Sequence, residues 1–151
     1  MRSVSLLVAD DVLEIVEYVE AAARRIRTHD IRVTRTTRAQ EALALAGERD
    51  FDVVITDLRM PRVDGLRILR AAYERNPAGR RAVLTGYNEI PQDGSPGDAH
   101  VDAVATKPLS MDELVDLIHA LVTNERLEMT HLREDAARRL RPTTPAQAPP
   151  R

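Results

Sequence analysis

Five side chains of this 151-residue chain have the types that phosphoryl and metal chemistry require, and each lies at the end of a short apolar run. They are Asp10, Asp11, Asp57, Thr85 and Lys107. Carboxylates are ligands for hard cations, and a carboxylate can also attack phosphorus as a nucleophile. The set therefore indicates phosphoryl transfer, provided that the fold brings the five side chains together.

The charges of these side chains suggest how such a site would work. Three carboxylates packed together repel one another and raise each other's proton affinity unless a cation compensates them. Oxygen ligands with open coordination positions suit Mg²⁺, which pairs with carboxylates and phosphate. Lys107 can contact one phosphoryl oxygen and the Thr85 hydroxyl can donate to another. In this arrangement Asp57 is the nucleophile, and the product is an aspartyl phosphate.

Short apolar runs alternate with helical patterns, which predicts an α/β fold with a doubly wound parallel sheet. The predicted strands are residues 4–9, 31–34, 51–56, 82–84 and 101–105. The predicted helices are residues 12–28, capped residues 39–48, a segment from Asp64 to before Pro77, and a last helix after Ser110. Thr37, Asp64 and a Ser110–Glu113 capping box are the expected caps. Because the carboxyl ends of parallel strands share one edge, the five side chains should converge there.

Residues 86–100 break the alternation of strands and helices. A helix is expected between the last two strands, but this segment contains Pro91, Gly94, Pro96 and Gly97. A proline inside a helix costs about 3 kcal/mol and a glycine about 1 kcal/mol. The sequence therefore predicts a loop, with an irregular or missing fourth helix.

Composition bounds the domain organisation and the partners. We expect a folded domain over residues 1–122, a helical extension over 123–141 and a disordered proline-rich tail over 142–151. A net charge of −2 and only four aromatic residues, one Phe and three Tyr, argue against nucleic-acid binding. The chain has no cysteine, no apolar run of membrane-spanning length and no signal peptide at its start, which favours a cytoplasmic protein.

Together, the acid pair, the segment DLRMPRVDG, the strand that ends at Thr85 and the segment TKPL resemble the receiver domain of two-component response regulators. The resemblance covers about residues 3 to 122. It implies a flavodoxin-like, five-stranded parallel sheet with strand order 2-1-3-4-5. It also implies phosphorylation by a histidine kinase or a histidine phosphotransfer protein, and a switched partner protein downstream. The chain itself would be a phosphoacceptor and not an enzyme, and a monomer or weak dimer.

The same resemblance implies a role for each site residue. Asp57 resembles the phosphoacceptor, and the Mg²⁺ ligands would be Asp11 directly, Asp10 through water, Asp57 and the backbone carbonyl of Arg59. Thr85 resembles the switch hydroxyl and Lys107 its counter-charge. The peptide bond before Pro108 would be cis, as an X-Pro bond permits. Arg59 and Tyr87 would flank the phosphoryl group and slow its hydrolysis by obstructing water.

The chain departs from the receiver pattern at the residues that usually report phosphorylation. Receivers carry Tyr or Phe three residues before the lysine, where this chain has Val104. The segment Thr85-Gly86-Tyr87 partly resembles single-domain receivers with a Phe-Ala-Thr-Gly motif, although Val83 and Leu84 replace Phe-Ala. That subgroup is known for an irregular fourth helix.

Three hypotheses follow from the sequence. The first is a stand-alone receiver that is phosphorylated on Asp57 and switches a partner or relays the phosphoryl group. The second is a pseudo-receiver, a non-switching interaction scaffold, which Val104 and the broken fourth helix favour and the intact site opposes. The third is an aspartyl phosphatase, which the sequence disfavours because Asp57 is followed by Leu58-Arg59 and not by a second acid two residues on. Taken singly, the site residues also have structural explanations as turns, caps or solvated side chains.

Overall fold

The fold is a five-stranded, all-parallel sheet in the order β2-β1-β3-β4-β5. A computed structural model of the chain describes residues 2–86 and 100–123. The strands are β1 (Arg2–Ala9), β2 (His29–Thr36), β3 (Val53–Thr56), β4 (Arg80–Thr85) and β5 (Ala103–Thr106), and the helices are α1 (Leu13–Arg24), α2 (Ala39–Glu48), α3 (Gly65–Arg75) and α4 (Met111–Thr123). The predicted flavodoxin-like α/β class and the strand order are confirmed.

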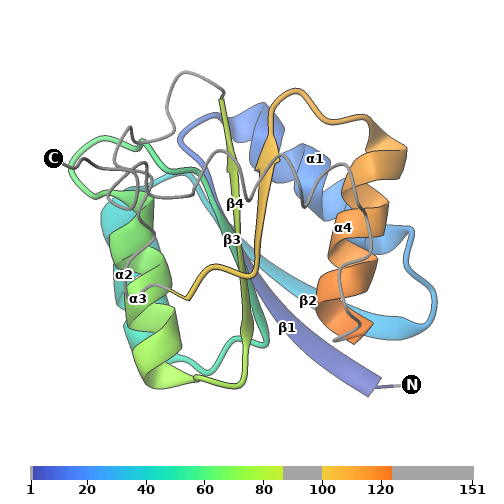
Figure 1. The fold of residues 1–151 in the computed structure, drawn as a ribbon, viewed down its shortest axis with the longest axis horizontal. Coiled ribbons are helices and arrows are strands. Elements are labelled where there is room, and N and C mark those ends of the chain that lie inside the picture. The colour runs from blue at the N-terminus through green and yellow to red at the C-terminus, as the bar shows by residue number, and fades with distance from the viewer. Residues whose placement is uncertain (1, 87–99, 124–151) are drawn as a thin grey trace, which may run out of the picture.

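Helices cover both faces of the sheet, as Figure 1 shows. Helices α1 and α4 lie on one face, over a core that includes Leu6, Val8 and Ile55. Helices α2 and α3 lie on the other face, over Leu7 and Val54. Alternate residues of one strand therefore enter two different cores. A strand that is buried on both faces reads as a continuous apolar run, which is why these segments were recognisable in the sequence.

The helix starts match the predicted caps in two of three places. The Asp64 carboxylate accepts a hydrogen bond from the Leu66 N–H at 2.7 Å at the start of α3. Ser110 and Glu113 form the reciprocal pair of a capping box before α4, at 2.9 and 3.1 Å. Thr37 was the wrong residue for α2, whose N-cap is Arg38 without a side-chain cap. The neighbouring Thr36 hydroxyl accepts from the Arg38 N–H instead.

Other boundaries and inward faces also differ from the prediction. Helix α1 ends at Arg24, well before the predicted residue 28, and β4 extends over Arg80–Thr85. In α3 the buried face includes Ile68, whereas Leu66 and Tyr73 are only half-buried. Helix ends fray where few tertiary contacts hold them, so periodicity alone locates them poorly.

The start of β5 is held against β4 by a buried arginine. Arg81 is 4% exposed, and its backbone N–H donates to the Asp102 carboxylate at 2.8 Å. Its Nε donates to the His100 carbonyl at 2.9 Å, and its guanidinium lies over the Tyr73 ring, 5.1 Å from the ring centroid. Burial is the main cause that lowers the pKa of this guanidinium. These contacts fix β5 in register at the edge of the sheet.

Several predictions concern residues outside the described parts of the chain. They are the irregular helix within residues 86–100, most of the helical extension and the proline-rich tail. Among the described helices, none has the length and apolar character needed to cross a membrane.

Candidate functional site

The predicted acids meet at the carboxyl edge of the sheet. Asp10 and Asp11 follow β1, and Asp57 follows the adjacent β3. One carboxylate oxygen from each lies within 4.8 Å of the other two. Asp10 and Asp57 are buried, at 1% and 4% exposure, whereas Asp11 is exposed. An all-oxygen donor set that is open on one side fits a hard divalent cation such as Mg²⁺.

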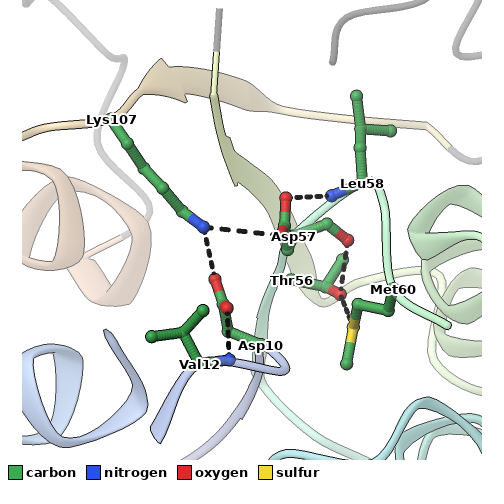
Figure 2. A network of polar contacts seen from close by, with 7 residues as sticks. All are labelled: Asp10, Val12, Thr56, Asp57, Leu58, Met60 and Lys107. Atoms are coloured by element: carbon green, nitrogen blue, oxygen red, sulfur yellow. Dashed lines mark hydrogen bonds and ion pairs between the residues drawn. The ribbon is translucent and has the colours of Figure 1, made fainter. Parts of the chain in front are cut away.

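Lys107 joins two of these acids across the sheet. It follows β5, two strands away from β3, and its ammonium lies 2.6 Å from Asp10 Oδ2 and 3.4 Å from Asp57 Oδ2. Figure 2 shows the side chain reaching toward both carboxylates. The lysine therefore supplies a positive charge at the point where a phosphoryl group on Asp57 would add negative charge.

The buried charges perturb each other's protonation. Burial is the main cause that raises the pKa of the Asp10 carboxyl, and the hydrogen bonds from Lys107 and Val12 offset it only in part. Burial alone would lower the pKa of Lys107. The hydrogen bond to Asp10 and the charges of Asp10 and Asp57 outweigh burial and raise it. Lys107 is therefore held as a cation within the site.

Backbone groups orient the two buried carboxylates. The Val12 N–H donates to Asp10 Oδ1 at 2.9 Å, and the Leu58 N–H donates to Asp57 Oδ1 at 2.7 Å (Figure 2). On the far side of the loop, the Gly65 N–H donates to the Leu58 carbonyl at 2.8 Å. A Cβ atom at Gly65 would lie 1.9 Å from the Asp57 carbonyl oxygen, so only glycine allows this close approach.

The remaining predicted residues have different positions. Thr85 is fully buried at the end of β4, beside β3, and its carbonyl accepts from the Lys107 N–H at 2.8 Å. The Lys107-Pro108 peptide bond is cis. Arg59 is exposed and its backbone pairs with Asp64 within the loop. Tyr87 lies outside the described residues.

Three contributors to the site were not singled out by the sequence reasoning. Val12 and Leu58 act through backbone N–H groups, which carry no side-chain signal. Gly65 lies in the segment DLRMPRVDG, but its close approach to the Asp57 backbone was not predicted. Val104, where an aromatic residue was expected, is 4% exposed and packs in the core beneath α2 and α3.

Three acids and a lysine thus meet at the carboxyl edge of a parallel sheet in the order β2-β1-β3-β4-β5. The family model of the response regulator receiver domain matches residues 6–119. The chain belongs to this family of two-component signalling proteins, whose receiver domains accept phosphoryl groups.

The similar proteins differ in the share of their length that the match covers. The hydrogenase transcriptional regulatory protein HoxA of Cupriavidus necator is 30% identical over 95% of this chain, but the match spans only 29% of HoxA. The response regulator receiver protein CpdR of Brucella abortus is 27% identical over 78% of this chain and 95% of CpdR. A Burkholderia pseudomallei response regulator, solved with a phosphorylated aspartic acid, superposes with a TM-score of 0.64 at 25% identity, over 89% of this chain and 69% of that one.

A pair of glycine substitutions tests the packing around Asp57. We expect Gly65→Ala to lower the free energy of unfolding by about 2 kcal/mol or more, because its Cβ displaces backbone. The matched control is Gly47→Ala in α2, where a Cβ would meet nothing within 4 Å. That substitution should stabilise by about 0.5 kcal/mol. Urea unfolding followed by circular dichroism measures both, and equal effects would contradict the close approach.

The raised pKa of Asp10 predicts proton release when a divalent cation binds. In the folded, metal-free chain this carboxyl keeps its proton at pH values where an ordinary carboxyl, with a pKa of 3.8, has lost it. Its contribution to stability is therefore full below that value and is lost as the pH rises through the raised pKa. Because a cation binds the carboxylate, Mg²⁺ affinity should fall as the pH drops through the same window.

Calorimetry in two buffers of different ionisation enthalpy measures this release. The wild-type chain should release protons on binding Mg²⁺ within this pH window, and Asp10→Asn should not. Metal binding to the wild type without any buffer dependence would show that Asp10 is already ionised, contrary to its burial.

Proposed function

We propose that this chain is a receiver that takes a phosphoryl group onto Asp57 from a histidine kinase or a histidine phosphotransfer protein, and that it then switches a partner or passes the group on. The observation that carries the proposal is the Lys107 ammonium, shared between Asp10 and Asp57 at the carboxyl edge of the sheet. A half-buried lysine between two acids can neutralise a third anionic group that arrives there.

The chemistry is an in-line phosphoryl transfer. The Leu58 N–H holds Asp57 Oδ1 at 2.7 Å, so we expect Oδ2, which faces Lys107, to attack phosphorus. As the new O–P bond forms, the P–N bond of the donor phosphohistidine breaks. Its electron pair leaves with the imidazole nitrogen. Lys107 and the Thr85 hydroxyl would then contact the phosphoryl oxygens.

A magnesium ion is part of the proposal. Asp10, Asp11, Asp57 and the backbone carbonyl of Arg59 would hold it, with Asp11 as the direct ligand and Asp10 acting through water. When bound, Mg²⁺ offsets the negative charge of the carboxylates and of the transferred group. The phosphorylated aspartic acid of the Burkholderia pseudomallei regulator supports an aspartyl phosphate in a related fold.

The side of the site near α1 suits a phosphodonor protein. Val12 and Leu13 follow the acid pair, are adjacent, and are 44% and 52% exposed. A donor protein with an apolar surface around its histidine could cover them while bringing the phosphohistidine to Asp57. We place this exchange in the cytoplasm, where a histidine kinase would present its catalytic part. The match to CpdR over 95% of that protein supports action as a stand-alone receiver.

The alternative is a pseudo-receiver that binds partners without switching. Val104 favours it, because the aromatic residue that usually moves with the switch threonine is missing. The four site residues Asp10, Asp57, Thr85 and Lys107 favour a working site, because a scaffold gains nothing from three buried polar groups beside a half-buried lysine. Slow hydrolysis through shielding by Arg59 and Tyr87 remains part of the first proposal.

Phosphate uptake separates the two functions. Incubation with acetyl phosphate and Mg²⁺ should give an acid-stable, base-labile phosphoprotein, visible as a shifted band on a phosphate-affinity gel. Asp57→Asn should reduce uptake to background, while Asp112→Asn, an exposed acid on α4, should keep the wild-type rate. Wild-type protein without uptake, or uptake that survives in Asp57→Asn, would refute the assignment.

A further inference from the structure

Two pockets flank the loop between β3 and α3. The first, with a volume of about 520 Å³, is lined by residues 58–60 and 62–64. The second, of about 410 Å³, lies between Pro61 and Arg62 of this loop and residues 37–40 at the start of α2. Arg62 lines both pockets. We call the two pockets and the arginines at their rims the loop surface.

The loop surface combines an apolar floor with unpaired positive charge. Leu58, Met60 and Val63 line the first pocket and are themselves at most 7% exposed. Arg38 and Arg62 are exposed, and within residues 2–86 and 100–123 neither guanidinium makes an ion pair or a side-chain hydrogen bond. By contrast, Arg24, Arg32 and Arg75 each pair with an acid.

One acid also lines this surface, but it is committed elsewhere. The Asp64 carboxylate accepts from the Leu66 N–H at 2.7 Å and caps α3. The unpaired guanidiniums therefore face solvent as the dominant charge. Two unpaired guanidiniums thus lie beside the pockets of a chain whose net charge is −2. Charge of one sign at a pocket rim selects a partner of the opposite sign.

The loop is tied directly to Asp57. Its first residue, Leu58, donates to the Asp57 carboxylate at 2.7 Å, and Gly65 at its end lies against the Asp57 backbone (Figure 2 shows the Leu58 contact). The Arg59–Asp64 bridge closes the loop between these points. Arg62, at the turn, has a φ of 77°, which L-residues adopt only when their surroundings hold them. A change at the Asp57 carboxylate therefore acts on the arginine that lines both pockets.

We propose that the loop surface is a docking site for an acidic segment of a partner protein, whose carboxylates pair with Arg38 and Arg62 and whose apolar side chain fills a pocket. Binding tightens when Asp57 is phosphorylated, because the loop is anchored to that carboxylate. This dependence rests on the proposed function, whereas docking to the unphosphorylated chain does not. A protein segment is favoured over a nucleic acid because neither pocket is lined by an aromatic ring for base stacking, and the first has an aliphatic floor.

A labelled peptide of alternating glutamate and leucine tests the site by fluorescence anisotropy. It is titrated with the full chain, with and without beryllium fluoride and Mg²⁺. The double variant Arg38→Gln/Arg62→Gln should bind about tenfold more weakly, as two lost ion pairs imply. The matched control Arg25→Gln/Arg27→Gln removes two exposed arginines near the end of α1 and should bind like the wild type.

The outcomes are separable. Absence of binding by the wild type, equal loss in both double variants, or displacement of the peptide by an unrelated single-stranded oligonucleotide at equal concentration would overturn the docking site.

Phosphate uptake is measured on the same samples, and Arg38→Gln/Arg62→Gln should phosphorylate at the wild-type rate. If the wild type takes up no phosphate but binds the peptide, the proposed function fails and the docking site stands. If phosphorylated and unphosphorylated chains bind equally, the coupling to Asp57 is wrong.

Discussion

The ion pairs of Lys107 with Asp10 and Asp57 are the contacts on which the site depends. Two like charges about 4.8 Å apart repel by about 3 kcal/mol at an effective dielectric constant of about 20, and three carboxylate oxygens lie within that distance of one another. The lysine offsets part of this repulsion, at 2.6 and 3.4 Å from two of the acids. The fold therefore gathers an excess of negative charge at one edge of the sheet, which a divalent cation would offset under the proposed function. Such a site costs stability and is kept for its chemistry.

The buried carboxylates are oriented mostly by backbone groups. Val12 and Leu58 donate N–H groups to the two buried carboxylates, and Gly65 lets the start of α3 reach the Asp57 carbonyl. The N–H groups of Val12 and Leu58 belong to the loops that follow β1 and β3. A change at either carboxylate therefore alters a hydrogen bond of the loop beside it. The loop after β3 is the better placed of the two to report it, since it carries Arg62 and lines both pockets.

The side chains of the site could be predicted from the sequence, but the backbone contacts that orient them could not. Buried parallel strands read as apolar runs, so the polar residues at their ends, such as Asp57 and Thr85, could be assigned to one edge. The hydroxyl that accepts from the Arg38 N–H before α2 belongs to Thr36 and not to the predicted Thr37, because two adjacent threonines offer the same hydroxyl and only the register of β2 decides between them. The close approach at Gly65 depends on where α3 lies relative to β3, which no local pattern encodes.

Val104 separates the input of this receiver from its usual output. The residue is buried and aliphatic, so the aromatic side chain that receivers usually carry at this position is missing. We propose that Asp57 is phosphorylated and that the loop after Asp57 transmits this change to a partner protein. Amide NMR with Mg²⁺ and beryllium fluoride tests it most directly. We predict large shifts at Leu58, Arg62 and Gly65 as well as at Thr85. A spectrum that does not change, or one that changes at Asp11 alone, would contradict it.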